Sequence, residues 1–483
     1  MTKLRPDGSS MAYSVYGIGG RDIAALKPFG GMLDSLWQGG DANPPLYTFL
    51  LHFWLKLGHS DIHVKTLSLL FGISAIPMMY VLVSRVGGQL AGHFSSLLLA
   101  ASPAAIKYST QARSYALFFF LSLLSTHALL LMVHEAGQKG RDKRLSHVHA
   151  GYLVAAVLTI YTHWFGLLLL TVQAIALVVY YPQSRRAFRR YSLTLIGIAV
   201  GCLPLIPFLV NQIARREGAG GFLWPGRPGV QSLYDLVAFL FGGQIPLALG
   251  VLILIVAFLV VRRAPGRQRE DTSKHIVFFS VYLLLPITVV YAVSSLLTHY
   301  TFFVPRYFLV FMTGIYVLIG LSLSRLQKRT AIAAVLLFVC APAIKLIRHS
   351  QQPETCYSKV ASMLPLQFSE RVAIVHLSPM SYYPVLHYSH GSRATSRILY
   401  SQTSSPTFLV RANCGGGLMS PDHLMERAAL ESYCEIWVVI DPIDQDKGVQ
   451  DSWRYLQSSG RFWLDEVTQV AGIRLEHYIS VQD

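Results

Sequence analysis

Apolar stretches of helical length recur along this 483-residue chain and constrain its fold more than any other feature. A helix needs about 20 consecutive apolar residues to cross the hydrocarbon of a bilayer. The run at 149–181 is too long for one crossing, so we divide it at Tyr161–Trp164. The sequence therefore predicts an α-helical polytopic membrane protein with about ten transmembrane helices, near 64–84, 90–107, 113–133, 149–162, 164–181, 191–211, 244–261, 275–297, 307–323 and 330–348.

The charge distribution supports this interpretation and argues against nucleic acid as a partner. Only 14% of the residues are charged and 53% are hydrophobic, whereas soluble domains carry about 25% charged residues. Residues 1–349 contain 31 basic and 11 acidic residues, but residues 350–483 contain 10 and 14. The basic residues lie in short clusters between apolar runs, which is where membrane proteins carry them.

Basic residues in the short loops predict the orientation. The loops at 85–89, 134–148, 182–190, 262–274 and 324–329 hold 17 Lys and Arg residues, and the alternate turns hold 6. The first set is therefore cytoplasmic, and both ends of the chain lie outside. This indicates a multi-pass protein of the plasma (inner) membrane with three parts: an extracytoplasmic arm with a juxtamembrane helix at 1–62, a transmembrane domain at 63–349, and a periplasmic domain at 350–483.

The C-terminal part has the pattern of a soluble α/β domain. RVAIVHL and EIWVVID have the character of buried strands, and EVTQVAGIRLEHYIS alternates as a late strand or a hairpin does. PMSYYPVLHYS and DSWRYLQSSG are predicted to be helices. Cys356, Cys414 and Cys434 allow one disulfide and one spare thiol in an oxidising compartment, and no Cys/His zinc spacing is present.

Unusual polar residues gather at the predicted outer ends of the helices. Charges at membrane depth are costly and mark candidate functional sites, although an arginine there can also anchor a helix by snorkelling. Arginine presents a fixed fork of donors that matches phosphate oxygens. We therefore predict that Arg113, Arg306 and His163 bind a lipid phosphate, in a pocket completed by Tyr108, Tyr115, Asn43, Tyr47, His299 and Tyr307.

If that phosphate carries a sugar, inverting transfer also needs a carboxylate that deprotonates the acceptor. The predicted topology leaves seven acidic residues of the membrane part on the outside, and Asp41, just before NPPLY, is the best placed. A turn residue before Asn-Pro is the alternative reading of Asp41. Whether the protein binds a metal ion stays open, because no set of metal-ligating residues is evident in the sequence.

Five sequence blocks, in the right order, resemble bacterial membrane glycosyltransferases of the C superfamily, of the family 39 and protein O-mannosyltransferase-like type. They are DANPPLYTFLLHFWLKLG, KTLSLLFGISAIPMMYVLVSRVGG, SPAAIKYSTQARSYALFFFLSLLS, YTHWFGLLLL and VPRYFLVF. The resemblance covers roughly residues 10–325. It implies transfer of a sugar from a polyprenyl-phosphate donor to an acceptor glycan, lipid or protein on the outer face, in some members with a divalent cation (Mg or Mn). It also implies phosphate-binding or structural roles for Arg113 and Arg306, with His163 near the same pocket.

Two departures from the family pattern bear on activity. The family begins with a transmembrane helix that ends in Asp-Glu, whereas here Ser10 and Met11 precede the matching AYS segment. The usual Glu before Ala-Arg is also replaced, since Gln111 precedes Ala112. We expect one of three explanations. The gene is truncated and has lost its first helix, the gene is degraded, or the protein is a non-catalytic relative of the family. A lipid-phosphate-binding scaffold is therefore the main alternative, and a lipid or sugar transporter is the weaker one, because no inverted repeat is visible.

Overall fold

The computed structural model describes most of the helical part of the chain and separate stretches of the C-terminal part. The described residues are 28–37, 43–58, 60–136, 142–180, 185–218, 227–243, 266–296, 302–350, 356–364, 371–377, 395–400, 424–440, 453–454, 456–470 and 473–481, with the isolated residues 248, 251 and 385.

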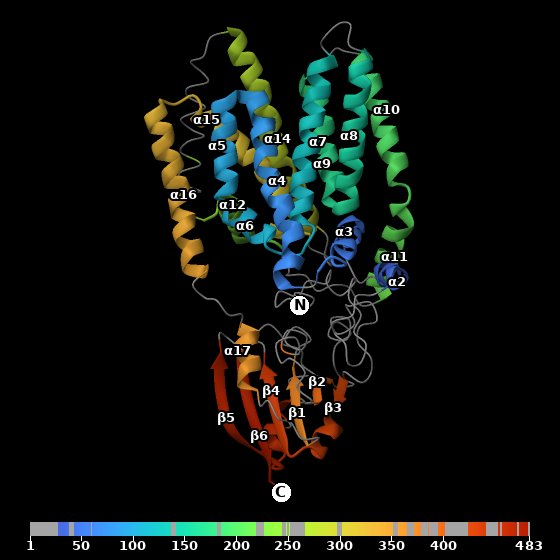
Figure 1. Ribbon diagram of the computed structural model, residues 1–483, viewed down its shortest axis with the longest axis vertical. Helices are drawn as coiled ribbons and strands as arrows, with labels where there is room; N and C mark the ends of the chain where they lie inside the picture. Colours follow the sequence, from blue (N-terminus) through green and yellow to red (C-terminus); the bar gives the residue numbers. More distant parts are fainter. Residues whose placement is uncertain are drawn as a thin grey trace.

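Helices form the larger part of the molecule, and most of them lie side by side in one bundle (Figure 1). Their bounds are α2 Phe29–Trp37, α3 Leu46–Trp54, α4 Asp61–Gly87, α5 Gln89–Ala100, α6 Pro103–Ser109, α7 Tyr115–Ala136, α8 Asp142–Thr162, α9 Phe165–Tyr180, α10 Arg185–Cys202, α11 Leu205–Gly218, α12 Val230–Phe241, α14 Gly266–Leu296, the 3-10 helix η1 Pro305–Phe311, α15 Met312–Leu323 and α16 Lys328–Ser350. The short helices α3 and α6 lie at the end of the bundle that faces the C-terminal sheet.

Several helices are long and apolar enough to cross a membrane, as predicted. Within the described residues they are Ile62–Gly87, Tyr115–His134, Ser273–Leu296 and Pro305–Leu323, and the pair Tyr191–Cys202 and Leu205–Ala214 adds a fifth if its 57° bend lies within one span. The predicted number of ten is therefore not confirmed. The span expected at 244–261 lies outside the described residues apart from Ala248 and Val251.

One predicted span is broken. The segment 90–107 forms two helices, because α5 ends at Ala100 and Ser102 caps α6, its hydroxyl accepting from the Ala105 N–H at 3.2 Å. Pro103 in the first turn of α6 has no N–H and suits a helix start. In contrast, the break expected at Tyr161–Trp164 is confirmed, since α8 ends at Thr162 and α9 begins at Phe165.

Deep in the bundle, Gln173 of α9 joins three helices through its amide group. Its Oε1 accepts from the Tyr152 hydroxyl of α8 at 3.0 Å, and its Nε2 donates to Ser125 at 3.0 Å and to Thr126 at 3.1 Å, both on α7. All four side chains are fully buried. Both amide hydrogens and the carbonyl therefore have partners inside the protein. We call this set the Gln173 network.

The C-terminal part contains a six-stranded sheet of order β3-β2-β1-β4-β6-β5. The strands are β1 Val372–His376, β2 Thr395–Tyr400, β3 Leu424–Glu426, β4 Glu435–Ile440, β5 Phe462–Val470 and β6 Ile473–Ser480, and helix α17 Cys356–Met363 packs against β5 and β6. Strands β1 to β4 pair in parallel, and β5 and β6 form an antiparallel hairpin, so the three predicted strand segments are confirmed.

Other predictions for this part are only partly testable. Residues 379–389 lie outside the described residues except Val385, and only fragments of 451–460 are described. Among the described cysteines Cys434 forms no disulfide, and its sulfur accepts a hydrogen bond from Arg371 at 3.9 Å. Cys414 lies outside the described residues, and the Cys356 side chain does too. An α/β domain and its boundaries stay predictions.

Candidate functional site

Polar residues from three distant turns meet at the end of the bundle where α3 and α6 lie. The ring of Tyr115 lies 5.2 Å from that of Tyr108, 5.9 Å from that of His163 and 6.5 Å from that of Tyr307. The rings of His163 and Tyr307 are 5.1 Å apart. We call the group the tyrosine–arginine cluster; it consists of Tyr108, Arg113, Tyr115, His163, Arg306 and Tyr307.

A short turn between α6 and α7 carries Arg113. Helix α6 ends at Ser109, and the Arg113 N–H donates to the Gln111 carbonyl at 2.8 Å before α7 begins at Tyr115. Arg113 and Tyr115 therefore lie at the turn where the chain changes direction between the two helices. The Arg113 guanidinium also donates a hydrogen bond to the Tyr115 side chain.

A 3-10 helix carries the second arginine. Val304 is extended, and Pro305 then starts η1 with its fixed φ and missing N–H. Arg306 follows at once, hydrogen-bonds the Tyr307 side chain and lies 5.5 Å from the centre of that ring. Arg306 also interacts electrostatically with Tyr115, as Arg113 does. Two permanently charged guanidinium groups from segments far apart in the sequence thus both interact electrostatically with the same phenol.

His163 is held by aromatic rings and by the backbone that follows it. Only 3% of its surface is exposed, and its ring stacks on Phe118 at 4.9 Å. Its Nδ1 accepts from the Phe165 N–H at 3.2 Å, so the ring proton sits on Nε2 and the imidazole is neutral. The buried Nε2 has no hydrogen-bond partner among the described residues. Sequence reasoning grouped His163 with the cations, but the structure makes it a neutral donor.

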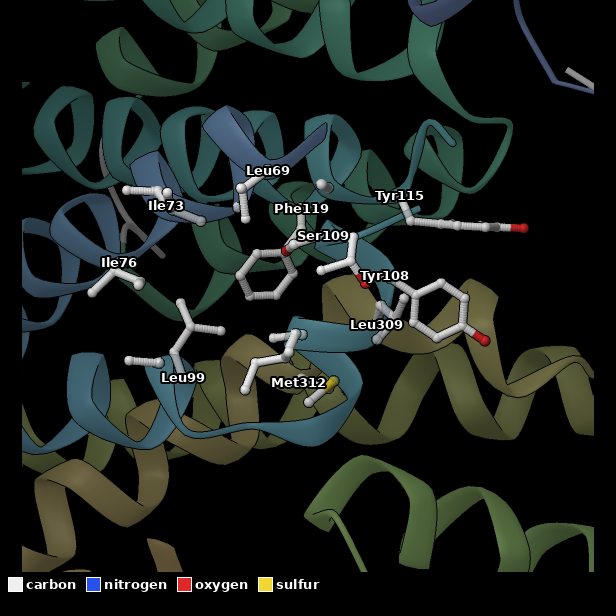
Figure 2. Close-up of a pocket in the computed structure, with 17 residues that line it drawn as sticks. Leu69, Ile73, Ile76, Leu99, Tyr108, Ser109, Tyr115, Phe119, Leu309 and Met312 are labelled. Atoms are coloured by element: carbon white, nitrogen blue, oxygen red, sulfur yellow. The ribbon is translucent and has the colours of Figure 1, made fainter. Parts of the chain in front are cut away.

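An apolar cavity of about 210 Å³ adjoins the cluster. Its walls come from α4, α5, α6, α7, η1 and the start of α15, and Figure 2 shows Leu69, Ile73, Ile76, Leu99 and Met312 around it. Tyr108 and Tyr115 close one end, and their hydroxyl groups point away from Ile76 and Leu99 (Figure 2). The cavity thus offers mostly hydrocarbon contacts, with the hydroxyl-bearing Ser109 and Thr110 in its wall and the two tyrosines at one end.

A close helix crossing shapes the cavity wall at Gly72 of α4. A Cβ at this position would lie 2.1 Å from Ser109 Oγ and 2.5 Å from Ser109 Cβ on α6. Both residues line the cavity. The absence of a side chain at Gly72 therefore lets α6, with Tyr108, approach α4.

The other predicted site residues lie elsewhere or outside the described residues. Tyr47 is fully buried in a separate apolar cluster and is not among the residues that line the cavity. Asn43 is half-buried, just before α3. Asp41 and His299 lie outside the described residues. Within the described part, no group of three or more His, Cys, Asp or Glu residues could hold a metal ion, and the divalent cation stays an untested prediction.

Sequence reasoning missed the apolar half of the site. Phe118 and Phe165 hold His163, and residues of six helical segments form the cavity. Apolar residues in a membrane helix carry no local signal that separates lipid-facing from cavity-facing positions. Only packing between segments distinguishes them.

Known structures share the overall fold, although no protein-family model matches the chain and no curated protein matches it. ArnT from Cupriavidus metallidurans in the apo state is similar with a TM-score of 0.59 at 12% identity, over 97% of this chain and 95% of ArnT. ArnT bound to undecaprenyl phosphate gives 0.56 at 12% identity, over 99% and 96%. An Archaeoglobus fulgidus oligosaccharyltransferase reaches only 0.46 at 12% identity, over 82% and 59%.

The ArnT comparison places the chain in a fold class. ArnT and this chain share one overall fold along nearly the whole length of both, and membership of the C superfamily stays a prediction. At 12% identity the similarity concerns the fold alone. The finer assignment to the family 39 and protein O-mannosyltransferase-like type stays a prediction.

Proposed function

We propose that the chain transfers a sugar from a polyprenyl-phosphate donor to an acceptor on the outer face of the membrane, with inversion. The observation that carries the proposal is that Arg113 and Arg306 both interact electrostatically with Tyr115, which lines one end of a mostly apolar cavity of about 210 Å³. Cationic donors next to an apolar cavity suit a ligand that has an anionic head and a hydrocarbon tail. ArnT has been solved with such a ligand, undecaprenyl phosphate.

The headgroup would be bound by groups of two kinds. The guanidinium groups of Arg113 and Arg306 supply positive charge and paired donors for phosphate oxygens. The Nε2–H of neutral His163 is a further buried donor that has no protein partner among the described residues. An uncharged donor in this position strengthens phosphate binding without adding a third buried charge, which would be costly at membrane depth.

The hydrocarbon chain would enter the cavity with its phosphate end at Tyr108 and Tyr115. Ligand pockets are mostly apolar, with a few placed polar groups that fix orientation. Both tyrosines line this cavity at the end with polar atoms. The first isoprene units would then contact residues such as Leu69, Ile73 and Met312.

The chemical step needs a base for the acceptor. A carboxylate takes the acceptor proton, the acceptor oxygen or nitrogen bonds to the anomeric carbon, and the phosphate leaves with the electron pair of the broken bond. Asp41 is our candidate base. Arg113 and Arg306 would stabilise the charge that grows on the leaving phosphate. A divalent cation, Mg or Mn, remains part of the proposal only as an optional partner.

We infer that the reaction takes place at the outer face of the plasma membrane. The excess of Lys and Arg in the loops assigned to the cytoplasm, 17 against 6 in the alternate turns, supports this orientation. The C-terminal sheet lies beyond the same end of the bundle as α3 and α6 (Figure 1), which agrees with an extracytoplasmic domain close to the acceptor.

The test is sugar transfer by the full chain in lipid nanodiscs, from a panel of polyprenyl-phosphate sugars. We expect turnover with at least one donor and its loss in Arg113→Ala and Arg306→Ala. Arg85→Ala is the matched control, because Arg85 lies in the last turn of α4, remote from the start of α7. Wild-type turnover in both cluster variants would overturn the assignment.

A non-catalytic scaffold that binds lipid phosphate is the second candidate. Ser10 and Met11, which stand where the resembling family has Asp-Glu, favour it. The same nanodiscs distinguish the two, since a scaffold binds polyprenyl phosphate through Arg113 and Arg306 but transfers no sugar from any donor.

A further inference from the structure

A chain of hydrogen bonds runs from the juxtamembrane helix α3 to the backbone of Arg113. The Ser68 hydroxyl, on α4, donates to the Arg113 carbonyl at 3.2 Å. The Tyr47 hydroxyl, on α3, lies 2.5 Å from Ser68 Oγ. A serine hydroxyl has one hydrogen, and Ser68 uses it on Arg113, so Tyr47 must be the donor to Ser68. The chain therefore has a fixed direction, from Tyr47 through Ser68 to Arg113.

Apolar packing encloses this chain and fixes the residue next to Arg113. The Tyr47 and Ser68 side chains are fully buried, and Ala112 is 2% exposed. Ala112 packs in one cluster with residues of three helices: Tyr47, Leu51 and Leu55 of α3, Val64 and Leu67 of α4, and Leu117 and Leu121 of α7. Two successive residues of the turn are thus held in two ways, Ala112 by packing and Arg113 by its carbonyl.

The energetic consequence follows from burial. A hydrogen bond is stronger in an apolar environment than in water, and an acceptor that loses its donor there is left unsatisfied, which is unfavourable. Residues 111–114 belong to no helix, and inside the turn the Arg113 N–H donates to the Gln111 carbonyl. If the Ser68 hydroxyl is removed, we expect the Arg113 carbonyl to rotate toward another donor and to take its side chain with it.

We propose that Ser68 and Tyr47 are positioning residues that hold Arg113 in its phosphate-binding orientation, and that they couple α3 to it. The inference rests on the proposed function, in which Arg113 binds the lipid phosphate. It adds that the phosphate-binding arginine and the helix that follows Asp41 are joined through one buried serine. A displacement of α3 is therefore transmitted to Arg113.

The experiment measures the affinity of the full chain in nanodiscs for a polyprenyl phosphate, with melting temperature in parallel. We expect Arg113→Ala to weaken binding about 100-fold, Ser68→Ala about 10-fold and Tyr47→Phe about 3-fold, because one lost hydrogen bond to a charged site is worth a few kcal/mol at most. Thr66→Val is the matched control, since the Thr66 hydroxyl donates to Ile62 within its own helix.

The decisive variant combines Ser68→Ala with Arg113→Ala. If Ser68 acts through Arg113, the double variant binds no more weakly than Arg113→Ala alone. If the affinity losses of the two single variants multiply in the double variant, Ser68 has a general structural role and the inference is overturned. Wild-type affinity in Ser68→Ala would also overturn it. If the wild type itself binds no polyprenyl phosphate, the proposed function fails first and the positioning role fails with it.

Discussion

Two polar groups in the helical bundle, the fully buried Gln173 network and the partly buried tyrosine–arginine cluster, are built on different principles. The Gln173 network is uncharged, and each hydrogen-bonding atom of the Gln173 amide has a partner on a neighbouring helix. The cluster brings two charged arginines and the neutral His163 to the end of a cavity, with the His163 Nε2 still available as a donor.

This difference separates a structural role from a binding role. A polar network whose bonds are all made inside the protein lowers the cost of burying it and fixes helix register. A cluster that holds charge and a buried donor with no protein partner among the described residues gains stability when an anion arrives. Variants of the network should therefore change stability more than binding, and variants of the cluster should do the reverse.

The largest expected effect is on binding and follows from Arg306→Ala. Loss of one bidentate charged donor should weaken polyprenyl-phosphate affinity about 100-fold, or about 2.7 kcal/mol. The melting temperature should change little, because the site has no bound anion to lose in the free protein. A competition assay with a fluorescent polyprenyl phosphate measures the first, and a thermal scan in detergent measures the second. Unchanged affinity of Arg306→Ala for polyprenyl phosphate would contradict the binding role of the tyrosine–arginine cluster, and with it the distinction from the Gln173 network.

The second effect is on stability and follows from Gln173→Leu. The substitution leaves the hydroxyl groups of Tyr152, Ser125 and Thr126 without their amide partner, which should cost about 1–3 kcal/mol. The melting temperature in detergent should fall, while the lipid affinity of the remaining folded protein stays within about 2-fold of wild type. Thr171→Val is the control on the same helix, because the exposed Thr171 hydroxyl bonds only to Leu167 of its own turn. A large affinity loss with no thermal effect would contradict the assignment.

A smaller effect on binding is expected from Gly72→Val. The new side chain meets Ser109 and enters the cavity wall, so it should displace α6 and weaken lipid affinity about 10-fold, or about 1.4 kcal/mol. Gly151→Val is the matched control, because a Cβ at Gly151 of α8 meets nothing within 4 Å. Equal affinities of the two variants would show that the hydrocarbon chain does not occupy this cavity.

The smallest effect extends the comparison to the C-terminal sheet. Burial lowers the pKa of His376 in β1 to about 3, from 6.5. Between these values the unfolded domain binds a proton that the folded domain does not, so stability is complete above pH 6.5 and falls as the pH drops. The loss should approach about 1.4 kcal/mol per pH unit. Chemical unfolding monitored by tryptophan fluorescence at pH 7.5 and 5.5 measures it. His376→Val should remove this part of the pH dependence; an unchanged slope would exclude His376 as its source.

Much of the local structure could be predicted from the sequence. The break before Phe165, the hairpin of β5 and β6, and strands β1 and β4 all follow from patterns within a few residues. Residues 90–107 show the limit of this reasoning, since mean hydropathy hid the cap at Ser102 and the proline after it. The sequence marks Arg113, Arg306 and His163 as unusual polar residues at helix ends, and their binding roles stay predictions.

By itself the sequence determined where apolar segments begin and end and which end of each carries arginine, because these depend on local composition and the cost of burying charge in lipid. Only the tertiary structure decided that Arg113 and Arg306 share Tyr115, that His163 is neutral, and that Tyr47 reaches Arg113 through Ser68. Those relations join residues from different helices. They depend on how whole helices pack together, and no pattern within one segment contains that information.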